Sequence, residues 1–363
     1  MSEYRRQLEN AVGAIAIHSA TSYSWMGERS PRLPPNVRLA LTPTAARAYL
    51  RFALQTRLYH SFYRLGRVAP NDGRKPKRSL DGRTPFVDSL SAANLGRGFV
   101  EDGWVVREIR GATAIVEKHG LALWVPVDDC VVPAGTRITA GEPVGLPHSK
   151  ELPAYSPGFY SAFGDRSFPA SNTTRVVRLY WNLTQEGAVP FVEVVSERLN
   201  HARLPFRFKV LSDPDNYERC DAAVIYLPVE TYQEAAPIIE RIHTHVASLL
   251  RTVTPVFTKP LSPGLGLAED PPGGHSFGMH RCGLVADGLI TAFSEAASSL
   301  PERAELAIRR FAEAGIDIES PFLNPGSTDS YVVFGSETQG LDGRQVRSRA
   351  HGESALLGDL PNA

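Results

Sequence analysis

Two stretches of the chain alternate apolar and polar residues in the manner of half-buried β-strands. They are RVVRLYWNL at 175–183 and PFRFKVL at 205–211. Because side chains alternate between the two faces of a strand, each stretch has an apolar face and an opposite polar face. The polar faces carry Arg178, Tyr180 and Asn182 in the first stretch, and Arg207 and Lys209 in the second. A solvated outer face explains either strand alone, but cations on one side of both strands indicate a binding surface.

Two dense segments follow, PVFTKPLSPGLGLAED at 255–270 and HSFGMHRC at 275–282. Simple folding requirements account for neither segment, and the pattern predicts tight loops there. Their ionisable side chains include Lys259, Glu269, His275, His280 and Arg281. The stretch from Arg175 to Cys282 is therefore where we expect the functional site.

Helical periodicity surrounds these strands. Residues 1–70 are predicted to form a helical region, in which Thr42 and Pro43 cap and begin a long helix that ends at Gly66. Apolar residues at helical spacing predict further helices after the strand at 175–183, after the run DAAVIYLP at 221–228, and between 301 and 315.

The remaining segments complete the expected organisation. Residues 96–150 contain short alternating runs separated by Gly, Pro and Asp, which predicts a small β-barrel-like module. Before it, residues 71–95 form a basic linker, which is either a solvated loop or a site for an acidic peptide or phosphates. The fold class is α+β, with a mixed α/β domain over 151–330 carrying the site and a largely flexible tail over 331–363.

Composition narrows the choice of partners and compartments. The 363 residues include 39 basic and 39 acidic side chains, so no global field draws the chain to nucleic acid or to a membrane. No apolar run approaches transmembrane length. Three widely spaced cysteines suit neither a disulfide framework nor a zinc site, which indicates a reducing cytoplasm.

Several familiar active sites are absent from the sequence. The glycines of PGLGLAEDPPGG fit neither the dinucleotide-binding pattern nor the phosphate-binding P-loop. His243 and His245 are two residues apart on a predicted helix and so face different directions, which argues against a metal pair.

The segments RLYWNLTQEGAVPFVEVVSERLN, LPFRFKVLSDPDNYERCDAAVIYL, PVFTKPLSPGLGLAEDP and SFGMHRCGLVADGL resemble the HopA-type type III secretion effector family. The resemblance extends from about Tyr59 to Asn324. It implies one of two functions. The founding members are effectors of plant pathogens. Relatives in gene clusters for class V lanthipeptides and thioamitides are implicated as lyases that remove phosphate from phosphoserine or phosphothreonine of a precursor peptide.

A second resemblance, to phosphothreonine lyase effectors, implies individual roles. It matches Lys209 to the general base and Arg178, Arg219 and Arg281 to the cations that bind phosphate. Tyr180 stands where those lyases have a histidine acid, so the acid is Tyr180, His280 or His275. Arg207 and Lys259 are expected to add to the phosphate site, and Asn182, Glu269 and His275 to complete the pocket.

The chemistry of elimination explains these residue types. The reaction removes a weakly acidic Cα proton and expels a phosphate with close to two negative charges. Arginine binds phosphate oxygens bidentately and remains charged. Lys209 can accept the proton only as a neutral amine, and no metal or other cofactor is required. We therefore expect a phosphorylated precursor peptide as substrate and a kinase-like phosphotransferase as partner, with a non-catalytic peptide-binding module as the alternative.

Overall fold

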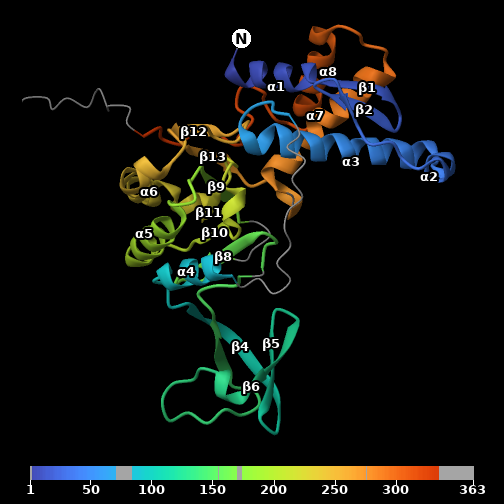
Figure 1. Cartoon of the computed structure of the whole chain (residues 1–363). Coiled ribbons are helices and arrows are strands. Elements are labelled where there is room, and N and C mark those ends of the chain that lie inside the picture. The colour runs from blue at the N-terminus through green and yellow to red at the C-terminus, as the bar shows by residue number, and fades with distance from the viewer. Residues whose placement is uncertain (1, 71–83, 154, 170–173, 275, 335–363) are drawn as a thin grey trace, which may run out of the picture.

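The computed structural model describes residues 2–70, 84–153, 155–169, 174–274 and 276–334. At its centre is a six-stranded antiparallel sheet in the order β12-β13-β9-β11-β10-β8 (Figure 1). The strands are β8 (Phe159–Phe163), β9 (Val176–Trp181), β10 (Arg207–Leu211), β11 (Ala223–Pro228), β12 (Lys259–Ser262) and β13 (Leu265–Glu269). The two alternating stretches of the sequence are therefore β9 and β10, and they flank β11.

Helices α5 (Ala188–His201) and α6 (Tyr232–Val246) cover the apolar face of this sheet (Figure 1). The ring of Phe191 on α5 lies 5.1 Å from Trp181 of β9 and 6.4 Å from Phe208 of β10. All three side chains are buried. The cations of β9 and β10 lie on the opposite face.

Helices from the beginning and from the end of the sequence pack together in a second group. They are α1 (Glu3–Gly13), α3 (Pro43–Ser61), α7 (Phe277–Ser294) and α8 (Leu300–Glu313). Thr42 caps α3 by accepting a hydrogen bond from the Ala45 amide, as its position before Pro43 predicts. The amino-terminal region also contains the short α2 (Pro35–Ala40) and a small sheet of β1 (Ile15–Ser19), β2 (Ser22–Trp25) and β3 (Glu28–Arg29), which helical periodicity did not predict. A 3₁₀ turn at Tyr63–Leu65 ends the α3 segment and brings Tyr63 to the central sheet.

A separate four-stranded sheet, here called the distal sheet, extends away from the rest of the chain (Figure 1). It follows α4 (Pro85–Ala93) and contains β4 (Phe99–Arg110), β5 (Thr113–Lys118), β6 (Leu121–Pro126) and β7 (Pro143–His148), in the order β6-β5-β4-β7. It has a small core of its own around Trp104, Val106 and Val116. The expected β-barrel-like module is thus an open sheet rather than a closed barrel.

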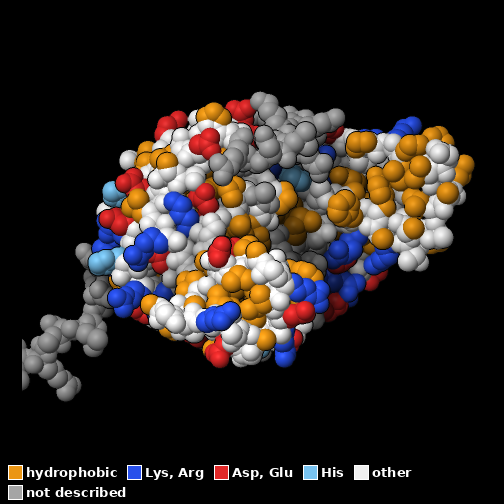
Figure 2. Space-filling model, turned by 90° about the horizontal axis from the view of Figure 1, so that it is seen from below, with side chains coloured by type: hydrophobic (Ala, Val, Ile, Leu, Met, Phe, Trp, Pro, Cys, Tyr) orange, Lys and Arg blue, Asp and Glu red, His pale blue; other side chains and the backbone are white. Residues whose placement is uncertain are grey.

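Hydrophobic side chains remain exposed in two places. Figure 2 looks from the distal-sheet end and shows one group on the distal sheet and another over α2 and the start of α3. The first includes Trp124, which is 65% exposed, and the second includes Leu39, which is 82% exposed. Among the described residues, no helix is long and apolar enough to cross a membrane.

Candidate functional site

The register of the central sheet brings cations from different strands into adjacent rows on one face. Arg178 of β9 and Arg207 of β10 both lie opposite Tyr226 of β11. In the next row, Tyr180 and Lys209 lie on either side of Val224. Side chains in one row of a sheet point to the same face, so Arg178, Arg207 and Lys209 converge around Tyr226.

The cations contact aromatic rings. The guanidinium carbons of Arg178 and Arg207 lie 5.3 Å and 4.9 Å from the centre of the Tyr226 ring, and the Lys209 amine lies 6.0 Å from it. The same amine lies 4.3 Å from the centre of the Phe159 ring, over which Arg219 also packs at 5.3 Å. These contacts are within the range of cation–π attraction and hold the positive groups together despite their repulsion.

A small pocket of about 150 Å³ opens at this cluster. Its lining comes from Arg178, Arg207, Lys209 and Tyr226, from residues of β8 such as Ser161, and from the segment before β8. We call it the cationic pocket.

Two of the neighbouring cations are neutralised by carboxylates. Arg178 is buried and pairs with Asp270, which follows β13. Arg219 donates two hydrogen bonds of 2.7 Å, from Nε and Nη2, to the carboxylate of Asp221. Within the described part of the chain, Arg207 and Lys209 form no ion pair, so the cationic pocket carries an excess of positive charge.

Asp221 is a buried member of the site that the sequence reasoning missed. Burial alone would raise the pKa of its carboxyl, but Arg219 and Lys209 hold that pKa below its ordinary value. Tyr59, at the end of α3, donates a hydrogen bond of 3.4 Å to the same carboxylate. The spacing of Arg219 and Asp221, two residues apart before a strand, was a signal for this pair.

His60 lies next to Tyr59 and close to the same charges. Burial and the nearby Arg64 and Arg219 lower its pKa to about 4, although Asp221 opposes them. The imidazole is therefore neutral at physiological pH, which makes it a poor partner for an anion.

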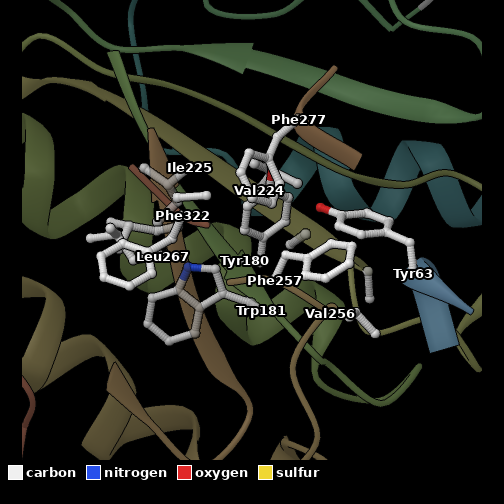
Figure 3. Close-up of a cluster of buried hydrophobic side chains, with 14 of the residues drawn as sticks. Tyr63, Tyr180, Trp181, Val224, Ile225, Val256, Phe257, Leu267, Phe277 and Phe322 are labelled. Carbon is white, nitrogen blue, oxygen red and sulfur yellow. The ribbon is translucent and has the colours of Figure 1, made fainter. Parts of the chain in front are cut away.

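Tyr180 shares the face of Arg178 but does not line the cationic pocket. The rings of Tyr63 and Phe277 pack over it at 6.5 Å and 6.3 Å, as Figure 3 shows. Its side chain is 3% exposed. Burial raises the pKa of Tyr180 to about 12, although Arg178 acts in the opposite direction, so the hydroxyl keeps its proton at neutral pH. The proposed acid therefore carries a proton but is covered.

Arg281 lies away from the cationic pocket, on the first turns of α7. Its guanidinium is fully buried and donates hydrogen bonds of 2.8 Å to the backbone carbonyls of Pro321 and Leu323. A third contact of 2.8 Å joins it to Nδ1 of His280. Burial lowers the pKa of Arg281 to about 10. These contacts anchor the segment after α8 to the helix group.

Lys259 and Glu269 lie on the sheet face opposite the cations. Lys259 pairs with Leu267 and Glu269 pairs with Val177 in the sheet, which places both in rows of the apolar face. The Lys259 amine binds Asp329 at 2.6 Å, and Glu269 accepts hydrogen bonds from the Tyr331 hydroxyl and the Asn324 amide. Both residues fasten the carboxy-terminal segment to the sheet.

Two predicted pocket residues remain. Asn182 is buried just beyond β9, and its side-chain amide donates to the Val253 carbonyl at 2.7 Å. His275 lies outside the described residues.

The structure thus brings together Arg178, Arg207, Lys209 and Arg219 from the predicted set, and adds Tyr226, Phe159 and Asp221. Tyr226 was visible as the one hydroxyl-bearing side chain in DAAVIYLP, but its place opposite both arginines depends on strand pairing. Among the described residues, no group of three His, Cys, Asp or Glu side chains is placed to hold a metal ion.

The match to a family model agrees with the resemblance seen in the sequence. The model of the HopA1 effector protein family matches residues 151–323. Two solved effector structures from Pseudomonas syringae are similar to the chain, each with a TM-score of 0.43. The effector of pathovar tomato strain DC3000 is 14% identical, and its match covers 77% of this chain and 95% of the effector chain. The effector of pathovar syringae strain 61 is 11% identical, and its match covers 89% of this chain and 98% of the effector chain. No curated protein matches the chain.

Proposed function

Residues 151–323 belong to the HopA1 effector protein family, and from this premise we propose that the chain is a phosphoserine or phosphothreonine lyase. Its substrate is a ribosomal precursor peptide that a kinase-like partner has phosphorylated in the cytoplasm. Elimination of the phosphate leaves dehydroalanine or dehydrobutyrine. One observation carries the proposal: Arg207 and Lys209 lie side by side in the cationic pocket without a carboxylate partner among the described residues.

The proposed reaction needs one base and a cationic site for the leaving group. The Lys209 amine takes the Cα proton, the electron pair of that bond forms the double bond between Cα and Cβ, and the bond from Cβ to the phosphate oxygen breaks. No water is consumed. The departing phosphate remains bound to Arg207 and Arg178, which lie on either side of Tyr226.

The two carboxylates near the site have a positioning role in this proposal. Asp221 binds the Nε and Nη2 edge of Arg219, which leaves Nη1 for an anion. Asp270, just after β13, holds Arg178 through a contact with Nη2. Each arginine is thus fixed before the substrate arrives, so less conformational entropy is lost when phosphate binds.

Substitution of Lys209 tests the base. Lys209→Arg places a permanent positive charge at this position and cannot accept a proton near neutral pH, so we expect binding of a phosphopeptide to persist and elimination to stop. Lys118→Arg, on the distal sheet, is the matched control. The measurement is single-turnover mass spectrometry, in which elimination leaves a product one water lighter than phosphate hydrolysis does. Near-normal elimination by Lys209→Arg would exclude Lys209 as the base.

A binding module is the second candidate, because Tyr180 is covered and His280 contacts Arg281 outside the cationic pocket. The same experiment separates the two functions. Phosphate-dependent binding without any change in peptide mass, in the presence of the kinase partner, would favour the binding module.

A further inference from the structure

A larger cleft adjoins the cationic pocket where the distal sheet meets the central sheet. Its volume is about 640 Å³, which is within the usual range of ligand-binding clefts. From the distal-sheet side it is lined by Phe99 and Pro147, and from the central-sheet side by Phe163 and Phe206. Leu152, on the segment before β8, also lines it. The lining is therefore mainly aromatic and aliphatic.

Arg207 connects the cleft to the cationic pocket. Its guanidinium lies 4.9 Å from the ring of Phe168, which lines the cleft, and 4.9 Å from the ring of Tyr226, which lines the cationic pocket. Tyr155 and Phe163 also line both spaces. A chain bound in one space can therefore continue into the other past Arg207.

We propose that this cleft binds an apolar side chain of the same peptide whose phosphorylated residue occupies the cationic pocket. The inference rests on the proposed function and adds the substrate class: a phosphopeptide with a large aliphatic or aromatic residue near the phosphorylated Ser or Thr. The cationic pocket suits an anion, and the cleft that adjoins it at Arg207 has an apolar lining. A peptide with a phosphorylated residue and a nearby apolar side chain fits both spaces at once.

The cleft makes the phosphate site selective. At about 150 Å³ the cationic pocket has room for little beyond the phosphorylated side chain, so it cannot distinguish one phosphopeptide from another. Contacts remote from the reacting atoms supply that selectivity and hold the Cα proton near Lys209. Apolar contacts in the cleft should therefore lower KM and also raise kcat.

The test uses the full chain and fluorescence anisotropy with four labelled peptides. Two contain phosphoserine flanked on both sides by leucines or by glutamines, and two are their unphosphorylated counterparts. We expect the leucine phosphopeptide to bind about tenfold or more tightly than the glutamine phosphopeptide. Leu152→Gln, at a position that is 47% exposed, should reduce this preference at least about threefold and leave the dependence on phosphate unchanged. Leu121→Gln, at an exposed leucine of the distal sheet, should change neither quantity.

The possible outcomes separate the two proposals. Equal binding of the leucine and glutamine phosphopeptides, or an unchanged preference in Leu152→Gln, overturns the cleft inference and leaves the lyase proposal standing. A leucine preference that does not depend on phosphate supports apolar binding by the cleft but overturns the cationic pocket as a phosphate site.

Discussion

Replacement of Arg281 by methionine separates an anchoring role from a phosphate-binding role. The sequence resemblance assigns this arginine to phosphate, whereas the structure buries it completely under the carbonyls of Pro321 and Leu323. The substitution removes two hydrogen bonds from a charged donor and leaves two buried carbonyls unsatisfied. Hydrogen bonds of this kind contribute about 1.5–3 kcal/mol each, so we expect the free energy of unfolding to fall by about 3–5 kcal/mol.

Arg207→Met is the matched control, since it makes the same change at a half-buried arginine. The Arg207 guanidinium contacts the rings of Phe168 and Tyr226 and forms no ion pair among the described residues, so its loss should reduce stability by about 1 kcal/mol or less. Arg207→Met should weaken phosphopeptide binding more than Arg281→Met does. Loss of a charge-assisted phosphate contact is expected to weaken binding about 10- to 150-fold.

Urea unfolding and peptide binding together decide between the roles. Trp25, Trp104 and Trp181 are buried, so tryptophan fluorescence reports unfolding. Arg281→Met should lower the midpoint by about 1 M urea, while Arg207→Met should leave the midpoint nearly unchanged. The reasoning is refuted if Arg281→Met unfolds at the wild-type midpoint and loses affinity only for the phosphorylated peptide.

Three further predictions concern Tyr180, Gly278 and His60. Tyr180→Phe should slow single-turnover elimination less than tenfold, below the 10²–10⁴ range of acid catalysis, because the rings above Tyr180 cover its hydroxyl; a larger loss would make it the acid. Gly278→Ala would place a methyl group 2.3 Å from the Tyr63 ring and should cost about 1–3 kcal/mol in a thermal melt, whereas Gly283→Ala on the same helix meets only flexible side-chain ends and should cost less. The pKa of His60 falls from 6.5 to about 4 on folding, so between these pH values the unfolded chain binds the extra proton. The free energy of unfolding should therefore rise with pH over this range, and it should rise more in the wild type than in His60→Gln. Equal pH dependence of the two proteins in urea titrations would contradict this prediction.

The sequence predicts the strands and their polar faces because alternation is a local property. Arg178, Arg207 and Lys209 share one face of the central sheet, as the period of two requires. The helix over 188–201 likewise buries Phe191 and Val195 at the expected spacing. What could not be read from the sequence is that β11 lies between β9 and β10, since this order depends on pairing between distant segments.

The same limit explains why some predicted cations lie elsewhere. A lysine or arginine has a role that depends on its partner, and the partner of Lys259 is Asp329, seventy positions away. The segment around Arg281 was expected to be a loop, but Ser276 caps a helix there by accepting a hydrogen bond from the Met279 amide. The helix turns Arg281 toward the carbonyls after α8, and no local pattern identifies that contact.

Charge pairing gives the physical reason for placing the chemistry at β10. Half-buried cations normally have carboxylate partners, because an unpaired charge loses hydration without compensation. Arg178, Arg219 and Lys259 follow this rule through Asp270, Asp221 and Asp329. Arg207 and Lys209, two residues apart on one strand face, keep only aromatic contacts within the described chain. Once Lys209 has taken the Cα proton, two like charges lie together on this strand face, and an anion that binds between them offsets their repulsion. The leaving phosphate is such an anion.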